Sequence, residues 1–287
     1  MIKLIASDMD GTLLNDKMQI SPGNVAAIKQ AQAQGVEFLV ATGRELKEAE
    51  PLVEAAGLHT GYITLNGARV FNTAGELSVD LPIADETAAK WVHDLKDADY
   101  YFELVTGKGV YSDDRVRRIQ NVADLLVDLN PDTNFKTGMI LAAARLEIIN
   151  INYVDNYQNL LDDPTTDIYK IIVFSSRGQS AFSGIRDEIA AGNELIVTSS
   201  SENNIEINNI KAQKGLALVD YAAERGIKRE EIMAIGDNLN DESMIRMAGT
   251  GVAMGNAIDY IKKIADDVTT VNTDDGVGAA ILKHILE

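Results

Sequence analysis

Short apolar runs alternate with stretches of helical periodicity in two parts of the chain, before residue 83 and after residue 208. The apolar runs cover residues 3–7, 36–41, 62–65, 232–235 and 251–254. The helical patterns cover residues 22–35, 45–57, 214–224 and 241–248. Short apolar runs bounded by turn residues predict buried strands, and strands that alternate with helices are typical of a doubly wound parallel sheet. We therefore predict an α/β fold with a Rossmann-like parallel-sheet core.

The alternation lapses between residues 83 and 208. Helices are predicted at 85–95, from 115 and at 179–190, and strands at 100–104, 109–112, 169–175, 195–199 and 204–207. This segment holds 21 acidic and 11 basic residues. We expect it to form an α+β cap domain, residues 83–208, inserted into a discontinuous core made of residues 1–82 and 209–287.

Polar side chains follow the predicted core strands at the point where each strand ends. Asp8, Thr42 and Asn66 end the first three strands, and Asp237 ends the fourth. In doubly wound sheets, ligands bind beyond the carboxyl ends of the strands, so these side chains are expected to share one crevice.

Asp8 and Asp10 supply the residue types that phosphate ester hydrolysis requires. The reaction needs a positioned nucleophile, a proton donor for the leaving oxygen and positive charge around the phosphoryl group. Two carboxylates separated by one residue at a strand end can act as nucleophile and acid/base, and Gly11 lets the backbone turn sharply after them. The alternative is an ordinary surface turn, because Asp and Gly are common in turns.

Two further positions offer groups that bind anions. Thr42, Gly43 and Arg44 lie between a buried strand and a helix, where N–H groups and a hydroxyl can bind phosphate oxygens. Lys214 opens a predicted helix and places a cation beside its N–H groups. The alternatives are that Thr42 is a helix N-cap and that Lys214 is a solvated surface residue.

The loop after the fourth strand is rich in acids and amides, Gly236-Asp237-Asn238-Leu239-Asn240-Asp241. A carboxylate at this strand end would complete a site for a hard metal ion. The loop would also cap the following helix through Asp241, and the two interpretations are compatible.

Composition narrows the class of partner. The chain has 287 residues, a net charge of −18 and no cysteine, which excludes disulfides and thiolate metal sites and favours a reducing compartment. No signal-peptide pattern opens the chain, and no apolar run reaches the roughly 20 residues that span a bilayer. The negative charge disfavours nucleic acid, but charges beyond about 8 Å are screened, so an anionic small ligand remains possible. We expect a cytoplasmic protein without nucleic-acid or membrane partners, and its oligomeric state is open.

Together these motifs resemble the haloacid dehalogenase-like superfamily. The motifs are Asp8-Met9-Asp10-Gly11-Thr12, Thr42-Gly43-Arg44, Lys214-Gly215 and residues 236–241, followed by Gly251-Val252-Ala253-Met254-Gly255-Asn256-Ala257, Ala265-Asp266 and Asp275-Gly276-Val277. With Asn66-Gly67-Ala68 and the position of the insertion, the chain resembles Cof-type phosphatases with a class IIB cap.

The resemblance implies a role for each matching residue. Asp8 would attack phosphorus to form an aspartyl-phosphate, and Asp10 would protonate the leaving alcohol and then activate water. The Asp8 carboxylate, the Asp10 backbone carbonyl and Asp237 would hold Mg²⁺. The remaining roles are phosphoryl binding by Thr42, Gly43, Lys214, Asn240 and the Met9 N–H, metal-shell positions for Asn238 and Asp241, and substrate-proximal positions for Arg44 and Asn66. The cap would close over the site and select the leaving group.

The implied substrate is a small phosphorylated metabolite, such as a sugar phosphate or a pyridoxal or flavin cofactor. Two other functions use similar residues. A phosphomutase or phosphotransferase of the phosphomannomutase type shares this core and cap. A phosphorylation-switched binding module also uses Asp, Thr and Lys around magnesium, although such modules are shorter and lack a large insertion.

Overall fold

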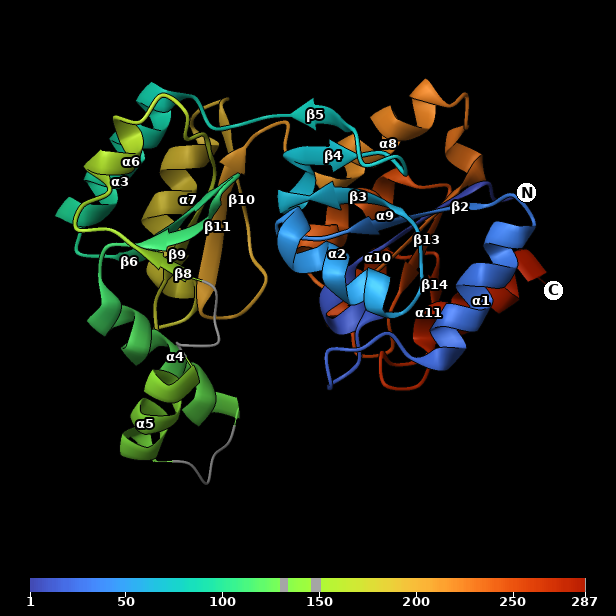
Figure 1. Ribbon diagram of the computed structural model, residues 1–287, viewed down its shortest axis with the longest axis horizontal. Coiled ribbons are helices and arrows are strands. Elements are labelled where there is room, and N and C mark those ends of the chain that lie inside the picture. Colours follow the sequence, from blue (N-terminus) through green and yellow to red (C-terminus); the bar gives the residue numbers. More distant parts are fainter. Residues whose placement is uncertain (130–133, 146–150, 287) are drawn as a thin grey trace. The chain divides into compact units, whose positions relative to one another are not determined.

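The computed structural model describes residues 1–129, 134–145 and 151–286. The chain divides into two compact units (Figure 1). The core unit comprises Met1–Leu81 and Lys211–Glu287, and the insertion unit comprises Pro82–Ile210. Each unit is built around a sheet of its own. No helix in the described ranges has the length and apolar character needed to cross a bilayer.

An eight-stranded sheet in the order β14-β13-β12-β1-β2-β3-β4-β5 forms the core unit. Its strands are β1 Leu4–Ser7, β2 Glu37–Ala41, β3 Gly61–Thr64, β4 Arg69–Phe71, β5 Leu77–Asp80, β12 Ile232–Gly236, β13 Thr250–Ala253 and β14 Asp267–Val268. The pairings from β14 to β3 are parallel, and β4 and β5 add an antiparallel edge. After β5 and the insertion unit, the chain returns to the sheet on the other side of β1, at β12. The topological switch point therefore lies at β1.

Helices cover both faces of this sheet. They are α1 Pro22–Ala33, α2 Leu46–Ala55, α8 Lys214–Glu224, α9 Glu242–Met247, α10 Asp259–Ile264 and α11 Gly276–Ile281. Buried residues of α1, α2, α10 and α11 pack with one face, and those of α8 and α9 pack with the other. Because both faces are covered, the parallel strands consist largely of consecutive apolar residues in the sequence. The predicted doubly wound, Rossmann-like class is confirmed.

The insertion unit holds a six-stranded sheet in the order β10-β11-β9-β6-β7-β8. Its strands are β6 Tyr101–Thr106, β7 Gly109–Ser112, β8 Ile151–Tyr153, β9 Ile168–Phe174, β10 Leu195–Thr198 and β11 Asn204–Asn209. Its helices are α3 Asp85–Asp97, α4 Arg115–Leu129, α5 Phe135–Arg145, α6 Gln158–Leu161 and α7 Ser183–Ala190. Residues of α3, α6 and α7 pack on one face of the sheet, and α4 packs against α5.

Candidate active site

Asp8 directly follows β1, at the switch point of the core sheet. Its N–H donates to the carbonyl of Ile235 at 2.9 Å, which fixes the end of β1 against β12. The residue is only 4% exposed. A buried carboxylate needs a partner, because desolvation of an isolated charge is costly.

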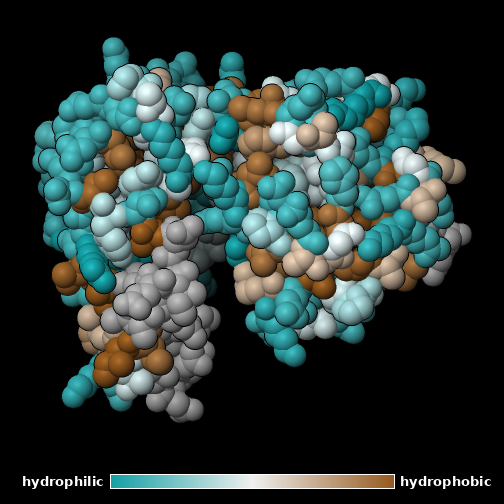
Figure 2. All heavy atoms as spheres, in the orientation of Figure 1, coloured by the Kyte–Doolittle hydropathy of each residue, from teal (hydrophilic) through white to brown (hydrophobic). Residues whose placement is uncertain are grey.

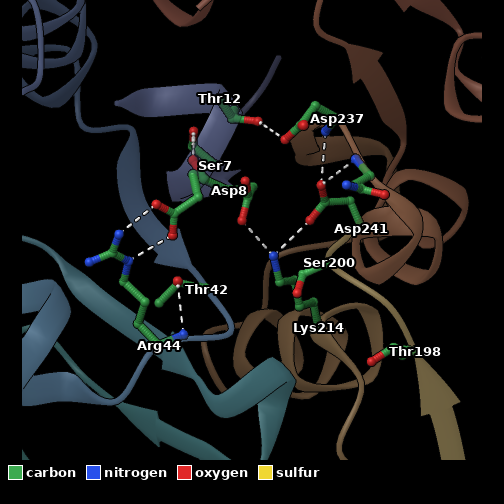
Figure 3. A network of polar contacts seen from close by, with 12 residues as sticks. Ser7, Asp8, Thr12, Thr42, Arg44, Thr198, Ser200, Lys214, Asp237 and Asp241 are labelled. Carbon is green, nitrogen blue, oxygen red and sulfur yellow. Dashed lines mark hydrogen bonds and ion pairs between the residues drawn. The ribbon is translucent and has the colours of Figure 1, made fainter. Parts of the chain in front are cut away.

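Lys214 provides that partner, and it is itself fully buried. Its Nζ donates to Oδ1 of Asp8 at 2.6 Å and to Oδ1 of Asp241 at 2.7 Å (Figure 3). Burial lowers the pKa of Lys214, but the charges of Asp241 and Asp8 outweigh burial and raise it overall. Lys214 is therefore a fixed cation inside the core unit, and the alternative of a solvated lysine is wrong.

Three carboxylates gather around this cation. Asp8, Asp237 and Asp241 each place an oxygen within 4.8 Å of the others. Burial raises the pKa of Asp8, and the charges of Asp241 and Asp237 add to that effect against the opposing effect of Lys214. Burial followed by the charge of Asp241 also raises the pKa of Asp237, to about 6. Three acids against one ammonium leave excess negative charge on hard oxygen donors, which fits a divalent cation such as magnesium.

Asp241 also organises the loop that carries Asp237. Its Oδ2 accepts the N–H of Asp237 at 2.8 Å and that of Asn238 at 3.0 Å. The predicted cap is confirmed in part: Asp241 occupies the N-cap position of α9 without a side-chain hydrogen bond to it, and its carboxylate closes a capping box on the short 3-10 turn Leu239–Asp241. The carboxylate instead reaches back to the strand end, where it holds the loop and Lys214 together.

The residues after Asp8 form one helical turn, Met9–Leu13, with a kink inside it. Gly11 has φ of +78°, and a Cβ there would approach Oδ2 of Asp237 to 2.7 Å, so glycine is required on both counts. Thr12 donates from Oγ1 to Oδ1 of Asp237 at 2.8 Å. The sequence prediction gave Thr12 no role, although its place two residues after Asp10 was a usable signal.

Arg44 contacts the carboxylate of Asp10 through a two-pronged ion pair. Its Nε donates to Oδ2 at 2.7 Å and its second guanidinium nitrogen to Oδ1 at 2.6 Å. This bidentate geometry orients a carboxylate more tightly than a single contact does. Arg44, predicted to lie near the substrate, here contacts the predicted acid/base.

Thr42 and Asn66 lie together at the ends of β2 and β3. Both are about 1% exposed, and the N–H of Asn66 donates to the carbonyl of Thr42 at 3.0 Å. Oγ1 of Thr42 accepts the N–H of Arg44 at 3.1 Å, which closes the turn around Gly43. The N-cap of α2 is Glu45, so the alternative of Thr42 as a helix cap is wrong.

Other predicted ligands lie at the margins of this cluster. The side chain of Met9 is buried in the apolar core, so only its backbone can face a ligand. Asn238 and Asn240 are half-buried in the loop after β12. Among the described residues, Asn240 makes no hydrogen bond to the other predicted phosphate ligands.

Similar proteins match this chain over nearly its whole length. A family model described as haloacid dehalogenase-like hydrolase matches residues 5–281. Phosphatase YwpJ of Bacillus subtilis is 37% identical over 287 residues, covering 99% of this chain and 100% of that protein. The 5-amino-6-(5-phospho-D-ribitylamino)uracil phosphatase YcsE of the same organism is 34% identical, covering 99% and 96%.

Solved structures agree in fold. A haloacid dehalogenase-like hydrolase from B. subtilis superposes with a TM-score of 0.87 at 35% identity, covering 99% of this chain and 100% of the other. The subclass IIB sugar phosphatase BT4131 gives a TM-score of 0.76 at 24% identity, covering 98% of each chain. At that identity the second likeness concerns the fold alone.

Proposed function

Because the chain belongs to the family of haloacid dehalogenase-like hydrolases, we propose that it is a magnesium-dependent phosphatase of small phosphorylated metabolites. Its relatives YwpJ and YcsE, 37% and 34% identical, are named phosphatases, and the chain is accordingly a phosphoric monoester hydrolase. The observation that carries the proposal is the buried Lys214 between Asp8 and Asp241, with Asp237 alongside. Nucleophile, fixed cation and metal ligands are then gathered at the edge of the core sheet where β1 and β12 end.

In the proposed first step, Asp8 attacks phosphorus and the ester oxygen leaves. The P–O bond to the alcohol breaks as the bond to Asp8 forms, and Asp10 gives its proton to the departing oxygen. Thr42, Gly43, Lys214, Asn240 and the Met9 N–H bind the phosphoryl oxygens in this proposal. Lys214 balances the charge that develops there from a position that needs no rearrangement.

In the proposed second step, water hydrolyses the aspartyl-phosphate. Asp10 takes a proton from the water as the water oxygen bonds to phosphorus, and the bond between phosphorus and the Asp8 oxygen breaks, which releases inorganic phosphate and restores Asp8. Arg44 orients Asp10 through its bidentate contact. The same carboxylate therefore acts as an acid and then as a base.

We propose that Asp8, the backbone carbonyl of Asp10 and Asp237 hold Mg²⁺, with Asn238 and Asp241 in or near its shell. Asp241 already uses both carboxylate oxygens in contacts with Lys214 and backbone N–H groups, which suits a supporting role. When bound, the ion supplies charge neutralisation for the phosphoryl group and the nucleophile.

Relatives suggest the substrate class. YcsE is named for a phosphorylated ribitylaminouracil, and YbhA of Escherichia coli, 27% identical, is named a pyridoxal phosphate phosphatase. Sugar phosphates and phosphorylated cofactors of this size are the proposed substrates. The insertion unit is the proposed substrate-specificity domain.

The test measures inorganic phosphate released from p-nitrophenyl phosphate and a panel of phosphorylated metabolites, with magnesium or with EDTA. We expect Asp8→Asn to lose all turnover and Asp10→Asn to fall about 100-fold or more, since general acid–base catalysis contributes at least that much. Asp220→Asn, on the exposed side of α8, is the matched control and should match wild type. Undiminished turnover by Asp8→Asn, or an isomerised sugar phosphate in place of free phosphate, would contradict the proposal.

A further inference from the structure

Two asparagines from a distant part of the core unit hold the turn that carries Asp10. Nδ2 of Asn256 donates to the carbonyl of Gly11 at 2.8 Å. Nδ2 of Asn272 donates to the carbonyl of Leu14 at 2.9 Å. The two contacts therefore bracket the turn at its kink and at its end.

The two asparagines also contact each other. The backbone N–H of Asn272 donates to Oδ1 of Asn256 at 3.0 Å, which orients the amide of Asn256 so that its Nδ2 faces Gly11. Asn256 follows β13 and Asn272 follows β14, and Gly255 is tied to Thr270 by a backbone hydrogen bond of 3.0 Å. The pair is thus anchored on the outer parallel strands and reaches toward the centre of the sheet.

Gly11 needs such an outside restraint. It lies between Asp10 and Thr12 at φ of +78° and ψ of −1°, and glycine populates positive and negative φ with similar ease. Nothing in the residue itself fixes the direction of the peptide planes on either side. The hydrogen bond from Asn256 fixes the plane after Gly11, and the contact of Thr12 with Asp237 fixes the next residue.

We propose that Asn256 is a positioning residue for Asp10, with Asn272 as its support. This inference rests on the proposed function, because Asp10 is the acid/base only there. Without the Asn256 contact the kink samples other conformations, and the Asp10 carboxylate spends less time aimed at the leaving oxygen. Phosphoryl binding through Thr42 and Lys214 involves other elements and is retained.

The defect should depend on the leaving group. Nitrophenolate is a weak base and leaves with little help from an acid, whereas an alkoxide leaves only when protonated. The ratio kcat/KM reports events up to cleavage of the ester. We therefore expect Asn256→Ala to lower kcat/KM roughly 10- to 100-fold for an alkyl phosphate and far less for p-nitrophenyl phosphate. A merely structural role would lower both equally.

A second variant separates the donor from the rest of the side chain. Asn256→Asp keeps an oxygen that can accept from Asn272 but cannot donate to Gly11, so it should be as defective as Asn256→Ala. Asn272→Ala should show a smaller defect of the same kind. The loss in kcat/KM of the double variant should be smaller than the product of the two single-variant losses, because both residues hold the same turn.

The control is Asn72→Ala, which removes an asparagine that makes a comparable number of hydrogen bonds in the turn after β4. It should leave both kcat/KM values at the wild-type level. Melting temperatures should differ little among all these variants, since the net contribution of a single hydrogen bond to stability is small.

Asp10→Asn measured in parallel tests the proposed function separately from the positioning role of Asn256. If Asp10→Asn is impaired and Asn256→Ala shows equal losses for the alkyl and aryl esters, or none, the positioning role is overturned while the proposed function stands. If Asp10→Asn keeps wild-type activity on alkyl phosphates, both are overturned. A selective loss on alkyl phosphates in both variants supports the inference.

Discussion

At the scale of single residues, the site depends on charges placed where water cannot compensate them. Lys214 is fully buried and contacts two carboxylates, and Asp8 beside it is almost fully buried. Removal of one partner from such a group leaves an uncompensated buried charge, which is far more costly than the loss of a surface ion pair. Each buried charge of the cluster is therefore tolerated only while its partners are present.

Asp237 makes the stability of the folded protein depend on pH. Burial and the charge of Asp241 raise its pKa to about 6, whereas an aspartate in an unfolded chain titrates near about 3.9. The folded state binds this proton more tightly. The resulting stability is complete below the unfolded pKa and is lost as pH rises through about 6.

We expect the metal-free wild type to lose on the order of 2 kcal/mol relative to Asp237→Asn between pH 4 and pH 7. Asparagine carries no charge at any pH, and its oxygen can still accept from Thr12. Denaturant unfolding in EDTA at several pH values gives the difference between the variants, with Asp220→Asn as control. A difference that does not change with pH would contradict the assignment.

At the scale of elements, close helix packing places Lys214. The first turn of α8 lies against α9, and the N–H of Gly215 donates to Oγ of Ser243 at 2.9 Å. A Cβ on Gly215 would collide with the backbone of Ser243. The absence of a side chain at this position therefore lets Lys214 reach Asp8.

We expect Gly215→Ala to cost about 1–3 kcal/mol through overpacking and to lower kcat, because α8 must shift away from α9 and carry Lys214 with it. Gly184 in α7 is the matched control, since a Cβ there meets nothing within 4 Å. Gly184→Ala should leave stability and activity unchanged or slightly improved. Chemical denaturation and steady-state kinetics check both; a Gly215→Ala variant as stable and active as Gly184→Ala would refute the packing argument.

Elements with strong apolar patterns were predictable, and weakly patterned ones were not. The runs that became β1, β2, β3, β12 and β13 are buried on both faces, so the sequence shows them directly. The core strands β4, β5 and β14 were missed, and so was β8 of the insertion unit. β5 is mostly exposed and β14 has two residues, so their strand conformation comes from pairing with a neighbour.

For the candidate site, sequence reasoning could predict location but not contacts. Asp8, Thr42, Asn66 and Asp237 follow strands, and parallel strands end at one edge. The pairing of Arg44 with Asp10, or of Asn256 with Gly11, depends on side-chain directions between segments up to 245 residues apart. No periodicity encodes such contacts.

At the scale of the whole molecule, charge is the dominant feature. The net charge is −18, and hydrophilic residues are spread widely over the visible face, with apolar residues among them (Figure 2). A folded chain brings like charges closer together than an unfolded one, so self-repulsion destabilises it until salt screens the charges. This general effect is separate from any effect of magnesium at the carboxylate cluster.

A comparison at matched ionic strength separates the two effects. Sodium chloride should raise the melting temperature of the EDTA-treated protein by screening alone. Magnesium chloride at the same ionic strength should raise it further, because an ion bound only by the folded state stabilises that state by mass action. Asp237→Asn should keep the sodium effect and lose most of the additional magnesium effect. If magnesium adds nothing beyond sodium in wild type, or adds as much in Asp237→Asn, the cluster of Asp8, Asp237 and Asp241 is not where the ion binds.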